Sequence, residues 1–131
     1  LPWGAFRGKV LGPTDPAKAA ADSLRGMLAA RWESLGLAAA PNTTDNGVHA
    51  SASPFEGLAE RMNWLQSPIA ADAFGKRLLG AGLSEETIRA WAVDPRVPLP
   101  GGGTGSLFDA LEDLDLEECI GKAIEIGAVS P

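Results

Sequence analysis

The residue whose type and position most invite a chemical role is a histidine. His49 is the only imidazole in 131 residues, and it lies in the stretch 45–54, which reads DNGVHASASP. Small side chains flank it on both sides, so nothing bulky nearby in the sequence could bury it. A lone histidine in a loop is usually only a solvated side chain, so its position alone assigns it no role.

Two other features invite a chemical interpretation. Residues 101–106, GGGTGS, precede a predicted helix, and backbone amides at a helix start favour anions. The stretch lacks the Lys-Ser/Thr pair of a Walker loop and follows no clear strand, so a flexible connector is the simpler interpretation. Cys119 is the only cysteine, so it forms no internal disulfide, and its apolar helical surroundings predict a buried thiol.

Composition limits the classes of partner. A hydrophobic content of 45% with a mean hydropathy near zero predicts a globular chain with a modest core. Eleven basic against seventeen acidic residues give a net charge of −6, which argues against a nucleic-acid or anionic-membrane surface. No apolar run approaches the roughly 18 residues of a membrane span. We expect no nucleic-acid or membrane partner and a cytoplasmic or other reducing compartment.

The elements that must position these residues are mostly helical. Thr14-Asp15-Pro16 is a helix-opening signal, and three-and-four spacing predicts a helix over 16–35. Its apolar positions are Leu24, Met27, Leu28, Trp32 and Leu35. Ser53-Pro54-Phe55-Glu56 is a capping box, which predicts a second helix. Its apolar stripe is Phe55, Leu58, Met62 and Leu65.

Four further segments follow. Ser67-Pro68 predicts a helix that ends at 80–82, and Ser84 predicts a shorter one through Trp91. Residues 94–105 are a Pro/Gly-rich connector. Ser106 caps a last helical region that the pattern breaks near Asp115. Only residues 48–51, around the histidine, indicate a short strand or an extended turn.

The segment around His49 resembles a known active-site motif. Residues 46–53, NGVHASAS, closely resemble the signature of nucleoside diphosphate kinases: Asn, two residues, His, Gly or Ala, Ser, Asp and a small residue. Upstream, 12–16 (GPTDP) resembles the family's Gly-x-Thr-Asn-Pro, and 23–26 (SLRG) resembles its Thr-Ile-Arg-Gly, in the family's spacing. Downstream, Glu60 stands where the family has a glutamate bonded to the catalytic imidazole, and Trp64 matches an aromatic.

The resemblance implies a fold and a domain organisation. The family fold is an α+β ferredoxin-like sandwich, of which this chain would hold an incomplete portion, as a mostly helical chain with one short strand near the histidine. Residues 1–66 would be the C-terminal part of the kinase-like domain and 67–131 a helical extension. We expect an oligomer, or a second chain or segment that supplies the missing N-terminal half.

The resemblance also implies an activity, that of a phosphotransferase. Such kinases move the γ-phosphoryl of a nucleoside triphosphate to a nucleoside diphosphate through a phosphohistidine, in ping-pong order. It assigns His49 as nucleophile, Glu60 as the group that orients it, and Ser51 beside it as the catalytic set. Thr14, Arg25 and Asn46 would bind the nucleotide. No protein metal cage is visible, so Mg²⁺ would arrive with the nucleotide.

Two other interpretations remain open. The chain could be an inactive kinase-like domain kept as a structural or assembly subunit, with residues 67–131 binding a partner. It could also be an unrelated helical domain, in which Arg25 is a surface residue and Trp64 part of a core.

Overall fold

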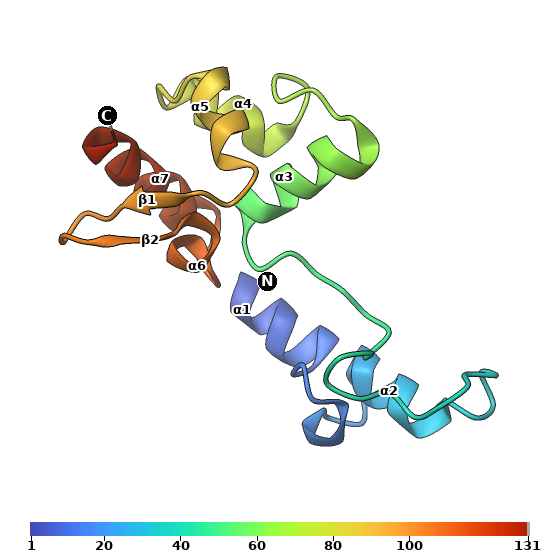
Figure 1. Cartoon of the computed structure of the whole chain (residues 1–131). Helices are drawn as coiled ribbons and strands as arrows, with labels where there is room; N and C mark the ends of the chain where they lie inside the picture. The colour runs from blue at the N-terminus through green and yellow to red at the C-terminus, as the bar shows by residue number, and fades with distance from the viewer. Residues whose placement is uncertain (131) are drawn as a thin grey trace. The chain divides into compact units, whose positions relative to one another are not determined.

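The computed structural model describes residues 1–130. The chain divides into two compact units, Leu1–Ala50 and Ser51–Pro131. The chain is mostly helical, and its described residues contain one two-stranded antiparallel sheet (Figure 1). This fits the mixed α+β class expected from the sequence. The domain boundary expected at residue 66 rests on the family resemblance, and the division by compactness falls before the helix that it assigned to the first domain.

The first unit begins with an unpredicted helix. α1 (Trp3–Ala5) continues directly into a π-helical stretch over Phe6–Leu11, and Gly12 ends it with a φ of 90°. A non-glycine residue rarely adopts that conformation, which explains why a glycine follows Leu11.

The helix predicted over 16–35 is shorter than expected. Pro16–Lys18 forms a single 3₁₀ turn, capped by the Asp15 side chain, and α2 starts afresh at Leu24–Arg31. The chain is extended at Ala19, and the Ser23 hydroxyl then accepts from the Gly26 amide and caps a new start. The prediction missed this second cap because the apolar spacing alone continued through it.

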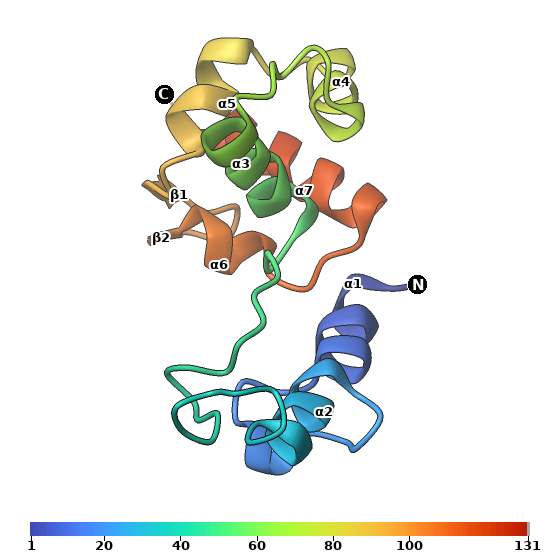
Figure 2. The same ribbon diagram turned by 90° about the vertical axis from the view of Figure 1, so that its right-hand side faces the viewer.

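The second unit is built around α3 (Pro54–Leu65), which packs against α4 (Ala73–Gly80), α6 (Leu107–Leu111) and α7 (Leu116–Val129) (Figure 2). Its predicted start is confirmed, because Ser53 caps it and Pro54 occupies the first turn. The Glu56 carboxylate reaches back to the amide of Ala52, one residue before the cap. Phe55 and Leu58 of the predicted stripe are fully buried, whereas Leu65 is 71% exposed.

The other helix starts predicted in this unit differ in outcome. α5 (Glu85–Trp91) and α6 begin as expected at Ser84 and Ser106, and the chain breaks before α7, as predicted near Asp115. α4 was expected to open at Ser67-Pro68 but begins at Ala73. Asp72 accepts from the amides of Phe74 and Gly75, so it caps the helix. Pro68 instead begins a turn, in which its carbonyl oxygen accepts from the amide of Ala71.

The sheet is not where the sequence indicated. β1 (Arg96–Pro98) pairs with β2 (Thr104–Ser106) in an antiparallel hairpin, with Val97 opposite Gly105. The expected Pro/Gly-rich connector is therefore a hairpin, whose turn uses positive φ angles at Gly102 and Gly103. The short strand expected near His49 is absent from the described residues, so that prediction is wrong.

The core of the second unit is continuous and apolar, and it includes the thiol predicted to be buried. Its members come from every helix of the unit and from β1, and they are Phe55, Leu58, Ile69, Phe74, Leu78, Ile88, Trp91, Val97, Leu107, Leu111, Cys119, Ile120, Ala123 and Ile126. The ring of Phe55 packs against that of Trp91 in a tilted arrangement and against that of Phe108 edge to face. Among residues 1–50, by contrast, Leu11 is the only large apolar side chain that is buried.

Candidate functional site

Arg25 joins two segments of the first unit that are far apart in sequence. Its Nη1 donates to the carbonyl oxygen of Gly12 at 2.6 Å, and its Nη2 donates to that of Val48 at 2.9 Å. Its Nε is buried and has no hydrogen-bond partner. Arg25 therefore holds the carbonyl that immediately precedes His49.

Gly26 lets α2 approach the turn before it. A β-carbon at this position would lie 2.0 Å from the carbonyl oxygen of Ala20, far inside van der Waals contact. The same carbonyl accepts from the Ser23 hydroxyl at 2.6 Å. The Arg-Gly pair of the SLRG motif thus has a local structural reason, since the glycine lets the chain turn into the helix that carries Arg25.

Asn46 ties the same two segments a second time. Its Nδ2 donates to the carbonyl oxygen of Thr14 at 3.3 Å, and its Oδ1 accepts from the amide of Val48, also at 3.3 Å. Both groups of Val48 are thus satisfied by side chains, the amide by Asn46 and the carbonyl by Arg25. This is the physical reason why the residues before His49 form no strand, because their backbone needs no ladder partner.

His49 itself is exposed at the end of the first unit, in a stretch without regular secondary structure. The small residues on either side leave the imidazole accessible, as the sequence predicted. The Thr14 side chain is also exposed.

The other two predicted catalytic residues belong to the second unit. The Ser51 hydroxyl donates to the Glu60 carboxylate, and both residues are half-buried. Glu60 projects from α3, the helix whose start is fixed by the Ser53 cap. Hydrogen bonds thus unite Thr14, Arg25 and Asn46 through backbone groups in one unit, and pair Ser51 with Glu60 in the other.

The sequence missed the role of backbone carbonyls in this arrangement. The oxygens of Gly12, Thr14 and Val48 are the acceptors that the predicted binding residues use. The type of a residue does not indicate whether its backbone carbonyl accepts a side-chain hydrogen bond. The motifs at 12–16 and 46–53 nevertheless include the three residues whose carbonyls do so.

The apolar positions predicted for the first helix line a groove instead of a core. It has a volume of about 260 Å³, and its walls are Leu24, Met27, Leu28, Arg31, Leu35 and Val48. Leu24, Met27 and Leu35 are 39–47% exposed.

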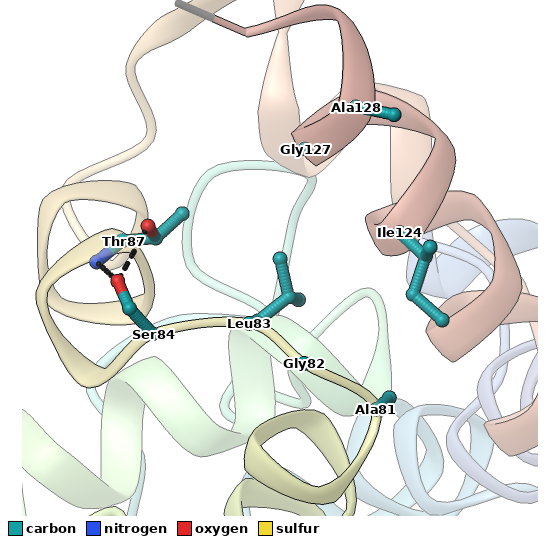
Figure 3. A pocket seen from close by; sticks show the side chains of 8 residues that line it. All are labelled: Ala81, Gly82, Leu83, Ser84, Thr87, Ile124, Gly127 and Ala128. Atoms are coloured by element: carbon teal, nitrogen blue, oxygen red, sulfur yellow. Dashed lines mark hydrogen bonds between the residues drawn. The ribbon is translucent and has the colours of Figure 1, made fainter.

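A second groove lies in the second unit, between the α4–α5 connection and α7 (Figure 3). It has a volume of about 360 Å³ and is lined by Ala81, Gly82, Leu83, Ser84, Thr87, Ile124, Gly127 and Ala128. Its hydroxyls, those of Ser84 and Thr87, hydrogen-bond to each other at 2.8 Å, and none of its lining residues is charged. The groove therefore offers no charged side chain to a phosphate.

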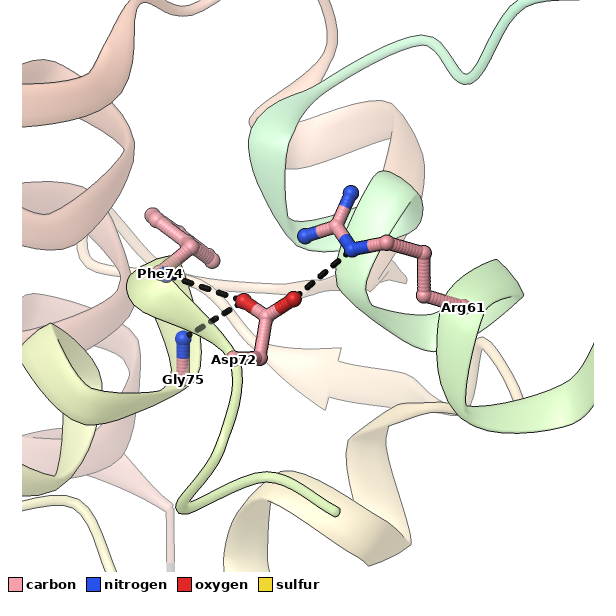
Figure 4. A network of polar contacts seen from close by, with 4 residues as sticks. All are labelled: Arg61, Asp72, Phe74 and Gly75. Carbon is pink, nitrogen blue, oxygen red and sulfur yellow. Dashed lines mark hydrogen bonds and ion pairs between the residues drawn. The ribbon is translucent and has the colours of Figure 1, made fainter. Parts of the chain in front are cut away.

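The best-defined charged contact is structural. Asp72 is 8% exposed at its side chain and accepts from the Nε of Arg61 at 2.7 Å, which ties α3 to the start of α4 (Figure 4). Burial raises the pKa of Asp72, but the hydrogen bond and charge of Arg61 and the amides of Gly75 and Phe74 outweigh it, so that the pKa lies below its ordinary value.

Residues 1–130 show neither a metal-binding cluster nor a membrane-spanning helix. They contain no group of three or more His, Cys, Asp or Glu side chains that could hold a metal ion. None of the helices in that range has the length and apolar character needed to cross a bilayer.

In comparisons with protein-family models, with curated proteins and with solved structures, nothing matches this chain. The kinase interpretation accordingly depends on the motifs and on the contacts described above.

Proposed function

We propose that this chain is the C-terminal portion of a nucleoside diphosphate kinase, of ferredoxin-like fold in its complete form, that transfers a γ-phosphoryl group through a phosphohistidine at His49. The observation that carries the proposal is the pair of hydrogen bonds that Arg25 donates to the carbonyl oxygens of Gly12 and Val48. The three motifs of the first unit that resemble the family, at 12–16, 23–26 and 46–49, meet through this side chain and Asn46. An unrelated helical domain gives no reason for these same three motifs to converge.

The proposed reaction proceeds in two steps, phosphoryl transfer to His49 and phosphoryl transfer from His49. A neutral imidazole nitrogen of His49 attacks the γ-phosphorus of ATP, so that a P–N bond forms as the bond to the β-phosphate oxygen breaks and ADP leaves. A β-phosphate oxygen of the nucleoside diphosphate then attacks the same phosphorus, and the P–N bond breaks. Mg²⁺ bound to the nucleotide would neutralise phosphate charge in both steps.

The remaining roles follow the resemblance. Glu60 would fix the tautomer and orientation of the imidazole, with Ser51 hydrogen-bonded to its carboxylate. The Thr14 hydroxyl would bind phosphate oxygen, and Asn46 and Arg25 would hold the nucleotide-facing segments in register. Arg25 already donates to two carbonyls, so in this chain its first role is to shape the site.

A second candidate function is favoured by a different observation. Residues 1–50 bury one large apolar side chain and leave the groove along α2 open, as expected of a piece that associates with something else. The chain would then be an inactive kinase-like subunit used in assembly.

Retention on immobilised ATP, with elution by free GDP, separates the two candidates. The kinase proposal predicts retention, and it predicts that Thr14→Val weakens it several-fold. This variant removes an exposed hydroxyl but keeps the carbonyl that Asn46 uses. Arg31→Gln, a change of an exposed charge on the same unit, is the matched control and should be retained like the unmodified chain. Absence of retention, or retention that is insensitive to GDP, would favour the assembly subunit.

A further inference from the structure

The bond between Asn46 and Gly47 is the part of the first unit most open to spontaneous chemistry. Gly47 is exposed, with a φ of 73°, and it has no β-carbon to shield its amide nitrogen. The side-chain amide of Asn46 lies on the preceding residue, within reach of that nitrogen for closure of a five-membered ring. The chain holds three asparagines, and only Asn46 precedes a glycine.

The fold around Asn46 favours the ring closure. Its Oδ1 accepts from the amide of Val48, two residues on, at 3.3 Å, so the side chain folds back along its own backbone in an Asx turn. Attack by the Gly47 nitrogen on Cγ would place negative charge on Oδ1. The Val48 N–H already points at that oxygen and would stabilise the charge.

The restraints against reaction are weak. The Nδ2 of Asn46, the group that must leave, is held by one hydrogen bond to the carbonyl of Thr14, at 3.3 Å, near the long limit for such bonds. We propose that Asn46-Gly47 is a deamidation site of the folded protein, and that conversion there releases the segment before His49 from Thr14.

The reaction needs only water. The Gly47 nitrogen forms a bond to Cγ and loses its proton. The Cγ–Nδ2 bond breaks, Nδ2 departs with a proton as ammonia, and the product is a succinimide ring. Water then opens either carbonyl of the ring, which gives aspartate or isoaspartate. The carboxylate of either product cannot donate to the Thr14 carbonyl, and it adds a negative charge three residues before His49. This chemistry does not depend on kinase activity.

The other two asparagines are internal controls. Asn42 sits in a comparable turn, with its Oδ1 accepting from the amides of Thr44 at 2.9 Å and Asp45 at 3.1 Å. Its successor is the β-branched Thr43, which shields the attacking nitrogen. Asn63 lies within α3, where the helix holds the next peptide nitrogen away from the side chain.

The test is to incubate the full chain, folded and in urea, at mildly alkaline pH, and to follow each asparagine by peptide mass spectrometry that separates aspartate from isoaspartate. The folded chain should lose the Asn46 amide progressively while Asn42 and Asn63 stay intact, at a rate no lower than in urea. Thr43→Gly should make Asn42 reactive, which isolates the successor residue as the deciding factor. Asn46→Gln should abolish conversion at this site.

Two results would overturn the inference. One is conversion of Asn46 several-fold slower in the folded chain than in urea, since the fold would then protect the amide. The other is conversion of Asn42 at the same rate as Asn46. Circular dichroism of Asn46→Gln and Thr43→Gly beside the unmodified chain verifies that the variants compared are folded.

Discussion

At the scale of single residues, Arg25 shows how one side chain can organise a segment without regular structure. Its guanidinium reaches carbonyl oxygens 13 and 23 residues away in sequence. A fork of fixed geometry suits two diverging acceptors, whereas a lysine ammonium on a flexible stem does not.

The substitution Arg25→Lys is therefore expected to cost about 2 kcal/mol in the free energy of unfolding of the first unit, because it removes one of two charge-assisted bonds and distorts the other. Urea unfolding followed by amide signals of residues 1–50 measures this loss. Arg31→Lys, on the same helix but exposed, should change stability by less than about 0.5 kcal/mol. Equal effects of the two changes would refute the special role of Arg25.

Sequence reasoning selected residues that the fold brings together, but it did not predict the contacts between them. It selected Arg25, Asn46 and Thr14 from motif spacing, and these three do meet in one unit. It assigned all three side chains to a ligand. In the structure the Arg25 and Asn46 side chains donate to backbone carbonyls, and Thr14 contributes one of those carbonyls. Residue types encode which side chains are donors, but the position of a carbonyl acceptor depends on the whole path of the chain.

At the scale of elements, three serine caps predicted helix starts correctly. Ser53, Ser84 and Ser106 all cap as expected. At α2 the prediction used the Asp15 cap and missed the Ser23 cap, and at α4 it used Ser67-Pro68 and missed Asp72. Asp72 prevails at α4 because Arg61 of α3 also holds it, and that contact is not visible in a local pattern.

Asp72 should make the stability of the second unit depend on pH. Its folded-state pKa lies below its unfolded value, so its contribution is complete above about pH 4 and is lost as the pH falls through the folded value. Asp72→Asn keeps an oxygen for the amides of Phe74 and Gly75 but removes the titrating charge. The difference in unfolding free energy between the two proteins should therefore shrink toward zero on acidification.

Urea titrations at a series of pH values below neutrality measure this difference, and Asp72→Ala, which also loses the cap, should cost about 2 kcal/mol near neutral pH. A difference between the unmodified chain and the Asp72→Asn variant that stays constant with pH would contradict the assigned pKa shift.

At the scale of the whole chain, the two units differ in how they are stabilised. The second has a continuous core, and the first depends on polar ties and one buried large apolar side chain. Composition predicted a globular chain but could not show that apolar residues would be shared so unequally. Several apolar side chains of α2 line an open groove and are partly exposed.

The reactivity of Cys119 can be used to test whether the core of the second unit is intact. It is fully buried, and burial raises the pKa of its thiol to about 11, with a hydrogen bond to the backbone of Phe55 acting in the opposite direction. Little thiolate forms below that value, so alkylation by iodoacetamide at mildly alkaline pH should be very slow in the native protein and fast in urea. Amide exchange in α2 should meanwhile be much faster than in α7. Rapid native alkylation, or equal protection of the two helices, would contradict this division.

The central claim is tested most directly by phosphoryl capture on His49. The protein, prepared with all its native partners, is incubated with Mg-ATP, kept away from acid, and mapped by mass spectrometry, with His49→Ala as control. The account predicts an acid-labile phosphate on His49 that added GDP removes and that His49→Ala lacks. Absence of phosphate on His49 in this preparation, or phosphate that GDP does not discharge, would contradict the kinase proposal.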